Sequence, residues 1–258
     1  MAYAVNVRIV HRFERAHRYL LARACQSRMD RSDDIIQLGE QFVLEIQRTI
    51  GQTVNLASGK NSDAFDVFKL SLSWSHDTRN KTVFATEGFV QTLSTDIAFP
   101  NSKLNFYKVA SRSRWFYPLT KRMTTSVEAE INYGDSYGET TELPFFERFY
   151  AGGAHSVRGY RSSTLGPREN GNALGGDFRV VGSAELIFMP PFTEENSTVR
   201  MRLFWDVGNV FDDIDYYNSA ELRQSTGMSL IWLSPIGPLS FSLSNPLNDK
   251  PGDSTESF

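Results

Sequence analysis

The chain has 258 residues, a net charge of −3 and 22% charged residues. This length fits one large β domain or two small domains, and the absence of a basic excess argues against nucleic-acid binding. No run of 18 or more apolar residues is present, which excludes a membrane-spanning helix. A transmembrane β-barrel would escape this test, because every second residue of its strands is polar.

The first part of the chain gives mixed signals. A short alternation of apolar and polar residues predicts a strand over 3–10, and residues 11–31 fit no clear pattern. A helix is predicted over 33–50, because apolar residues recur there at helical spacing. Ser32 would cap the start of this helix and Gly51 would end it. We expect it to be either an ordinary surface helix or a loop helix packed on the rim of a barrel.

From Asp66 onward the chain reads as β structure. Eight alternating segments follow one another, and each has one apolar and one polar face. Several reach about 9–11 residues, the length that crosses a bilayer when tilted, whereas a typical globular strand has about 5–6. Aromatic residues lie near the strand ends, where membrane barrels carry their aromatic girdles. These aromatic residues are Trp74, Trp115, Phe116, Tyr117, Tyr133 and Trp232.

The connections between these segments differ in length. Those at 118–123, 190–196 and 234–238 are short, whereas those at 134–176 and 209–221 are long. Short turns on one side and long loops on the other are typical of outer-membrane barrels, in which the short turns face the periplasm. We therefore expect an all-β, antiparallel transmembrane β-barrel, here a partial barrel of about eight or nine strands. A soluble β-sandwich is the alternative fold.

The longest of these connections contains a stretch, Phe145 to Pro167, that is too rich in Gly and Arg for a strand interior. Gly152, Gly153 and Gly159 permit backbone angles that are closed to other residues. The aromatic residues of this stretch argue against disorder. We therefore expect a long loop with a fixed shape, of the kind that is usually functional.

Charged residues on two later strands could meet the tip of this loop. Strand parity places Glu185 on the polar face of one strand and Asp206 on the polar face of the next. Both acids would then point into the lumen. If the loop folds inward, the guanidinium of Arg158 can bridge them, and a buried arginine needs such partners.

The loop resembles the signature loop of the BamA family, the central barrel of the bacterial outer-membrane protein assembly machine. The motifs that carry the resemblance occur in order along the chain. They are Phe149-Tyr150-Ala151-Gly152-Gly153, Val157-Arg158-Gly159-Tyr160, Ser162-Ser163-Thr164-Leu165-Gly166-Pro167, Ser183-Ala184-Glu185-Leu186, Phe204-Trp205-Asp206-Val207-Gly208 and the run 232–239.

The resemblance implies a site as well as a fold. The tip, residues Val157, Arg158, Gly159 and Tyr160, would plug into the lumen, with Arg158 docked on Glu185 and Asp206. The residues Phe149, Tyr150, Gly152 and Gly153 would form the hinge and packing part of the loop. Residues 66–258 would be the C-terminal half of a sixteen-stranded barrel without its last strand, and residues 1–65 match the family poorly. The lateral-gate strands and the periplasmic POTRA domains of the family are expected outside this chain.

The function implied by the resemblance is folding and insertion of β-barrel proteins into the outer membrane of a Gram-negative bacterium. Its partners would be nascent outer-membrane proteins, lipoprotein subunits of the assembly complex and outer-membrane lipid, with no nucleic acid. Two alternatives stay open. One is a protein-translocation pore of the same superfamily, such as a two-partner secretion transporter or TamA, and the other is a soluble β-sandwich binding module.

An enzymatic function is not expected. His155 and Ser156 are adjacent, so they are poorly placed to act as base and nucleophile, and no Gly-x-Ser-x-Gly motif is present. The acidic group Asp212, Asp213 and Asp215 lacks the central Gly and terminal Glu of a calcium loop. We therefore expect no catalytic residue, no metal site and no cofactor.

Overall fold

The computed structural model describes residues 3–5, 41–54, 61–99, 104–190 and 198–257. Ten antiparallel strands in these ranges form one sheet, in which neighbours in the chain are neighbours in space. The strands are β1 (Tyr3–Val5), β2 (Gln41–Val54), β3 (Asn61–Asp77), β4 (Gly88–Ala98), β5 (Phe106–Thr120), β6 (Met123–Ser136), β9 (Phe178–Phe188), β10 (Val199–Phe211), β11 (Arg223–Ser234) and β12 (Gly237–Pro246). The eight strands expected after Asp66 are all present.

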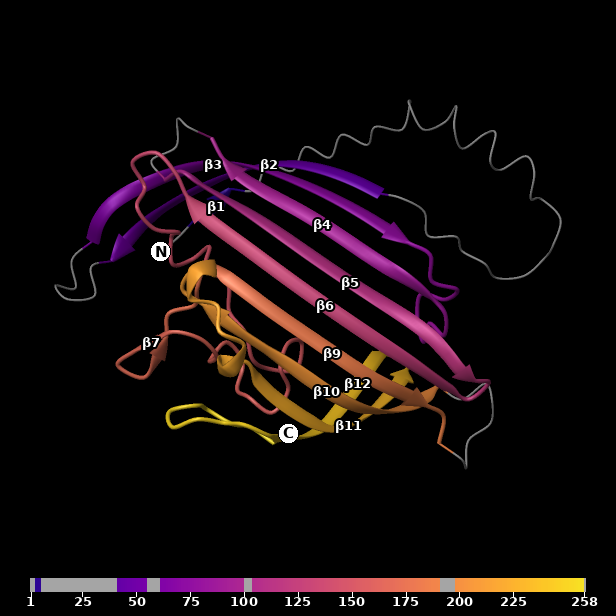
Figure 1. The fold of residues 1–258 in the computed structure, drawn as a ribbon. Helices are drawn as coiled ribbons and strands as arrows, with labels where there is room; N and C mark the ends of the chain where they lie inside the picture. The colour runs from indigo at the N-terminus through magenta and orange to yellow at the C-terminus, as the bar shows by residue number, and fades with distance from the viewer. Residues whose placement is uncertain (1–2, 6–40, 55–60, 100–103, 191–197, 258) are drawn as a thin grey trace, which may run out of the picture.

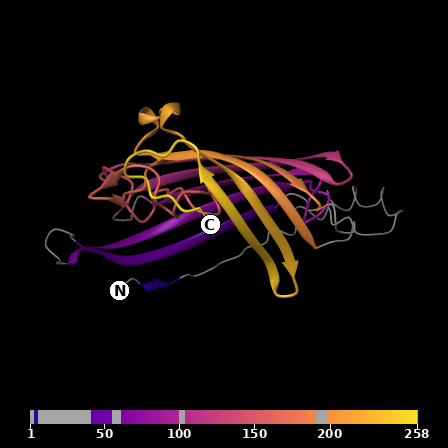
Figure 2. The ribbon, with the colours of Figure 1, turned by 90° about the horizontal axis from the view of Figure 1, so that it is seen from below.

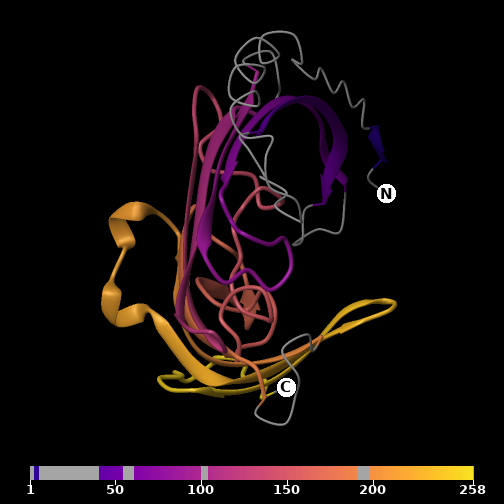
Figure 3. The same cartoon turned by 90° about the vertical axis from the view of Figure 1, so that its right-hand side faces the viewer.

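The sheet curves around a long loop. This loop, residues 137–177, connects β6 to β9 and contains a small hairpin of β7 (Arg168–Glu169) and β8 (Asn172–Ala173). Figure 3, a view turned by 90° from Figure 1, shows that the loop lies on the concave side of the sheet. We call this concave side the lumen.

The two faces of the sheet differ in composition in the manner of a membrane barrel. Along β10, Leu203 and Trp205 are 47% and 44% exposed, whereas Phe204 and Asp206 are 3% and 0% exposed. The apolar side chains on the outer face therefore meet the surroundings, and carboxylates are buried on the inner face. A soluble sandwich would have the opposite arrangement, so this sheet is the wall of a transmembrane barrel.

Strand lengths agree with this assignment, since the eight wall strands β3–β6 and β9–β12 have 10 to 17 residues. Tight turns join β5 to β6 and β11 to β12. The β11–β12 hairpin extends clear of the long loops in Figure 2. The opposite end of the sheet carries residues 137–177 and 212–222, the latter with the short 3-10 helices η1 (Ile214–Tyr216) and η2 (Ser219–Glu221). No helix in the described ranges is long and apolar enough to cross a membrane.

The helix predicted over 33–50 is wrong where the structure describes it. Gln41–Val54 is strand β2, whose residues Phe42, Leu44 and Ile46 pair with residues of β3. A short apolar stretch of this kind fits the helical and the strand period equally well. The hydrogen-bonding edge of β3 decides in favour of the strand, since long-range pairing overrides local propensity. The remainder of the predicted helix, 33–40, lies outside the described residues.

Strand β2 also explains why the sheet has more strands than the eight or nine expected. Within the range 3–10, Tyr3–Val5 forms β1 and pairs with β2. Residues 6–10 of that predicted strand lie outside the described part of the chain.

Candidate functional site

The tip of the loop between β6 and β9 depends on its glycines. Gly152, Gly153 and Gly159 have φ angles of +101°, +94° and +90°, so all three use backbone angles that are closed to most other residues. The amide of Gly153 donates to the carbonyl of Tyr160 at 2.8 Å, which closes the turn. A Cβ atom on Gly159 would lie 3.3 Å from the Cβ of Ser225 on β11. The tip therefore approaches the wall closely.

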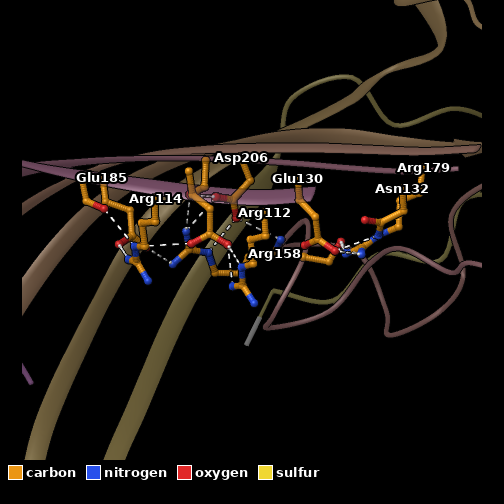
Figure 4. Close-up of polar contacts among 12 residues, drawn as sticks. Arg112, Arg114, Glu130, Asn132, Arg158, Arg179, Glu185 and Asp206 are labelled. Carbon is orange, nitrogen blue, oxygen red and sulfur yellow. Dashed lines mark hydrogen bonds and ion pairs between the residues drawn. The ribbon is translucent and has the colours of Figure 1, made fainter. Parts of the chain in front are cut away.

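At this tip, Arg158 reaches two acidic residues of the wall. Its Nε and Nη2 atoms donate to the two carboxylate oxygens of Asp206 at 2.7 Å each, and its backbone amide donates to Oδ2 at 3.1 Å. Its Nη1 lies 3.0 Å from Oε1 of Glu185. Figure 4 shows these three residues within a row of charged side chains along the inner face of the sheet. We call this set the arginine clamp.

Burial makes the clamp strong. Asp206 is 0% and Glu185 6% exposed, so neither carboxylate is satisfied by bulk water. Burial lowers the pKa of Arg158, but the carboxylates of Asp206 and Glu185 outweigh this effect and raise the pKa above its ordinary value. The guanidinium therefore stays charged.

Further residues complete the clamp. The hydroxyl of Ser183 donates to Asp206 at 2.7 Å and accepts from Arg158 at 3.2 Å. The guanidinium of Arg158 lies 3.6 Å from the ring centroid of Phe204, within the range of a cation–π contact. Sequence reasoning missed the contributions of Ser183 and Phe204, although strand parity places both on the inner face.

Glu185 is shared among three arginines. Besides Arg158, it contacts Arg114 on β5 at 2.7 Å and Arg202 on β10 at 3.4 Å. These two contacts were also missed. Arg114 lies on β5, far from β9 in sequence, and strand parity does not give the lateral reach of the Arg202 side chain on the neighbouring β10.

The neighbours of Arg158 in the loop are held by packing. Val157 and Tyr160 are 0% and 1% exposed and lie in a cluster with Ala151, Leu165, Val181 and Val210. The hydroxyl of Tyr160 donates to the carbonyl of Gln224 at 3.3 Å. Burial, with the nearby Asp253, raises the pKa of Tyr160 to about 12. The tip is thus fixed by apolar contacts as well as by charge.

The residues expected to form the hinge and packing part of the loop lie at its first crossing of the lumen. Phe149 forms an isolated β-bridge with Gly176 and lies under the ammonium of Lys108, 4.9 Å from the ring centroid. The hydroxyl of Tyr150 donates to the carbonyls of Phe145 and Leu174, both at 3.4 Å. These contacts tie the two ends of the loop together.

A segment that sequence reasoning did not single out covers the tip. In residues 247–257, which follow β12, Ser254 accepts from the amide of Arg161 at 2.8 Å, and the amide of Glu256 donates to Gly159 at 2.9 Å. Asp253 contacts Arg223 at 2.5 Å and Arg168 at 3.6 Å. No motif in the sequence signals this arrangement, because it consists largely of backbone hydrogen bonds.

The structure shows where the residues lie that were considered above as possible catalytic or calcium-binding groups. His155 is exposed, and Asp213 caps the 3-10 helix η1 by accepting from the amide of Asp215 at 3.0 Å. Among the residues that the structure describes, no three His, Cys, Asp or Glu side chains gather in a way that could hold a metal ion.

The fold and the site together define an outer-membrane β-barrel wall with a loop docked in its lumen. The Omp85 superfamily domain matches residues 6–258, and the chain belongs to this family. The match begins well before residue 66, the start of the barrel half that the sequence resemblance implied.

Similar proteins agree with this assignment. The chain is 36% identical over 221 residues to the outer membrane protein assembly factor BamA of Neisseria meningitidis, covering 74% of the chain and 28% of that protein. It is 23% identical over 198 residues to a SAM50-like protein of Schizosaccharomyces pombe, covering 72% of the chain and 42% of that protein. A crystal structure of BamA from Haemophilus ducreyi lacking POTRA domains 1–3 superposes with a TM-score of 0.76 at 25% identity, covering 86% of the chain and 50% of that structure. The chain therefore spans half or less of the length of these relatives.

Proposed function

We propose that this chain is part of an assembly factor that folds β-barrel proteins and inserts them into the bacterial outer membrane. The observation that supports this proposal most directly is the arginine clamp, in which Arg158 at the tip of an inward loop binds buried acids of an Omp85 barrel wall. The similarity to BamA supports it independently.

In this proposal the residues of the loop brace the barrel and perform no covalent chemistry. Folding of the substrate itself drives insertion, which proceeds by addition of substrate strands to an exposed edge of the barrel. The clamp keeps the wall rigid while that edge opens. The proposed partners are nascent outer-membrane proteins, lipoprotein subunits of the assembly complex and outer-membrane lipid.

The test reconstitutes the full-length protein in liposomes and measures the rate at which a urea-unfolded outer-membrane barrel protein folds into them. We expect the wild-type protein to accelerate folding and Arg158→Ala to lose most of that acceleration. Liposomes that instead pass an unfolded polypeptide into their interior without accelerating barrel folding would refute the assembly proposal and indicate a translocation pore.

A further inference from the structure

A second group of charges holds the loop at the other side of the lumen. Glu147 lies at the start of the loop, and its carboxylate oxygens contact Lys69 on β3 at 3.2 Å and Lys108 on β5 at 2.9 Å. The three side chains are only 15%, 15% and 18% exposed. Ion pairs that are largely shielded from water are less weakened by solvent and salt than exposed ones. We call this set the glutamate clamp.

The two clamps have opposite polarity. In the arginine clamp the loop supplies the cation and β9 and β10 supply the acids, whereas in the glutamate clamp the loop supplies the acid and β3 and β5 supply the cations. The order β3-β4-β5-β6-β9-β10 in the sheet places the two clamps at different parts of the wall. The loop therefore crosses the concave face between them.

A further contact lies on the wall between the two clamps. On β9, Arg179 forms an ion pair with Glu130 of β6 at 2.5 Å and donates to the loop hydroxyl of Ser156 at 3.3 Å. At the glutamate clamp, Lys108 also lies over the ring of Phe149. The loop is thus held along its path, and each end meets side chains of opposite charge.

We propose that Glu147 is a positioning residue, and that the loop from Glu147 to Arg158 is a brace whose register on the wall is set by two ion clamps of opposite sign. Sliding the loop toward β9 would carry Glu147 away from Lys69 and Lys108, and sliding it toward β3 would carry Arg158 away from Asp206 and Glu185. Both displacements separate opposite charges that are largely shielded from water and leave them uncompensated, which disfavours the wrong registers. The inference deepens the proposed assembly function, on which its biological meaning rests.

The first experiment measures release of the loop directly. Glu147→Gln in the detergent-solubilised full-length protein leaves Lys69 and Lys108 without this carboxylate and creates no new trypsin site. We expect trypsin to cleave after Arg148 roughly tenfold faster than in the wild type, because cleavage follows the population of the open loop. The matched control is Glu139→Gln, which changes another glutamate of the same loop, one that is exposed and lies outside the glutamate clamp. We expect no change in the control.

The second experiment separates charge pairing from a general structural role. Glu147→Lys alone gathers three cations at the clamp, and we expect it to lower the heat resistance of the folded barrel on a semi-native gel. Adding Lys108→Glu restores an opposite pair, so the swapped double variant is expected to recover much of the lost resistance.

Two outcomes would overturn the inference: trypsin cleavage of Glu147→Gln at the rate of the wild type, or a swapped variant no more resistant than the sum of its single changes predicts. The proposed function fails separately. If Glu147→Gln releases the loop but folds substrate barrels at the wild-type rate, the brace stands and the assembly role of the loop is refuted.

Discussion

Removal of the Arg158 side chain is the most informative perturbation of this barrel. Glu185 would keep its contacts with Arg114 and Arg202. Asp206 would keep only the hydroxyl of Ser183 among its side-chain donors in the described part of the chain, and it is 0% exposed. The damage from Arg158→Ala is therefore concentrated on Asp206, a buried carboxylate that loses its cation.

Breaking a buried ion pair by removing one partner costs about 3–5 kcal/mol, because the remaining charge is left uncompensated. At about 1.4 kcal/mol per factor of ten, this corresponds to an increase of roughly two to three and a half orders of magnitude in the population of the released loop. The barrel is then expected to open at a lower temperature.

The assay measures the heat resistance of the full-length folded protein on a semi-native gel, defined as the temperature at which the compact band disappears. The control is Arg112→Ala, because Arg112 also lies on the inner face and pairs with Glu128 at 2.5 Å, but its side chain is 55% exposed. We expect a large loss of heat resistance for Arg158→Ala and little for Arg112→Ala. Equal resistance of Arg158→Ala and the wild type would refute the clamp.

Three further predictions concern the same loop. Asp206→Ala is expected to lower heat resistance as Arg158→Ala does. The double variant is expected to lose less heat resistance than the two single variants lose together, since the two residues are coupled. Strictly additive losses would contradict a direct pair. Gly159→Ala is expected to lower the free energy of unfolding by about 1–3 kcal/mol, because φ is +90° and the new Cβ meets Ser225. The control is Gly171→Ala, which has a φ of +83° but no atom within 4 Å of the new Cβ, so it measures the cost of backbone strain alone. An equal loss in both variants would disprove the steric contribution of Ser225. Burial raises the pKa of Asp177 to about 7, with Arg148 opposing the rise and Asp212 adding to it. The stabilisation from protonated Asp177 is complete below about pH 4 and is lost as the pH rises through about 7, so the heat resistance of the folded barrel, measured after incubation at each pH, should fall over that range. Asp177→Asn should remove this fall, and an unchanged pH profile in that variant would show that another group titrates.

The sequence determined the β architecture after Asp66, because the period of two in a half-buried strand is written directly in the order of the residues. The same order misled at 41–50, where Phe42, Leu44 and Ile46 suit a strand but their neighbours also fit a helical stripe. Only pairing with β3 resolved this, and hydrogen bonding to a distant strand has no local signature.

The sequence predicted one part of the site and could not predict another. Parity predicted that Glu185 and Asp206 share the inner face, and the local motif supplied Arg158, so their meeting could be anticipated. The glutamate clamp could not, because Glu147 lies 78 residues from Lys69 and 39 from Lys108, and charged residues are common on a lumen face. The curvature of the sheet and the path of the loop across it bring these three side chains together. The sequence by itself therefore determined which residues face the lumen, whereas the tertiary structure decided which of them meet, since lateral distance around a curved wall depends on all the strands between.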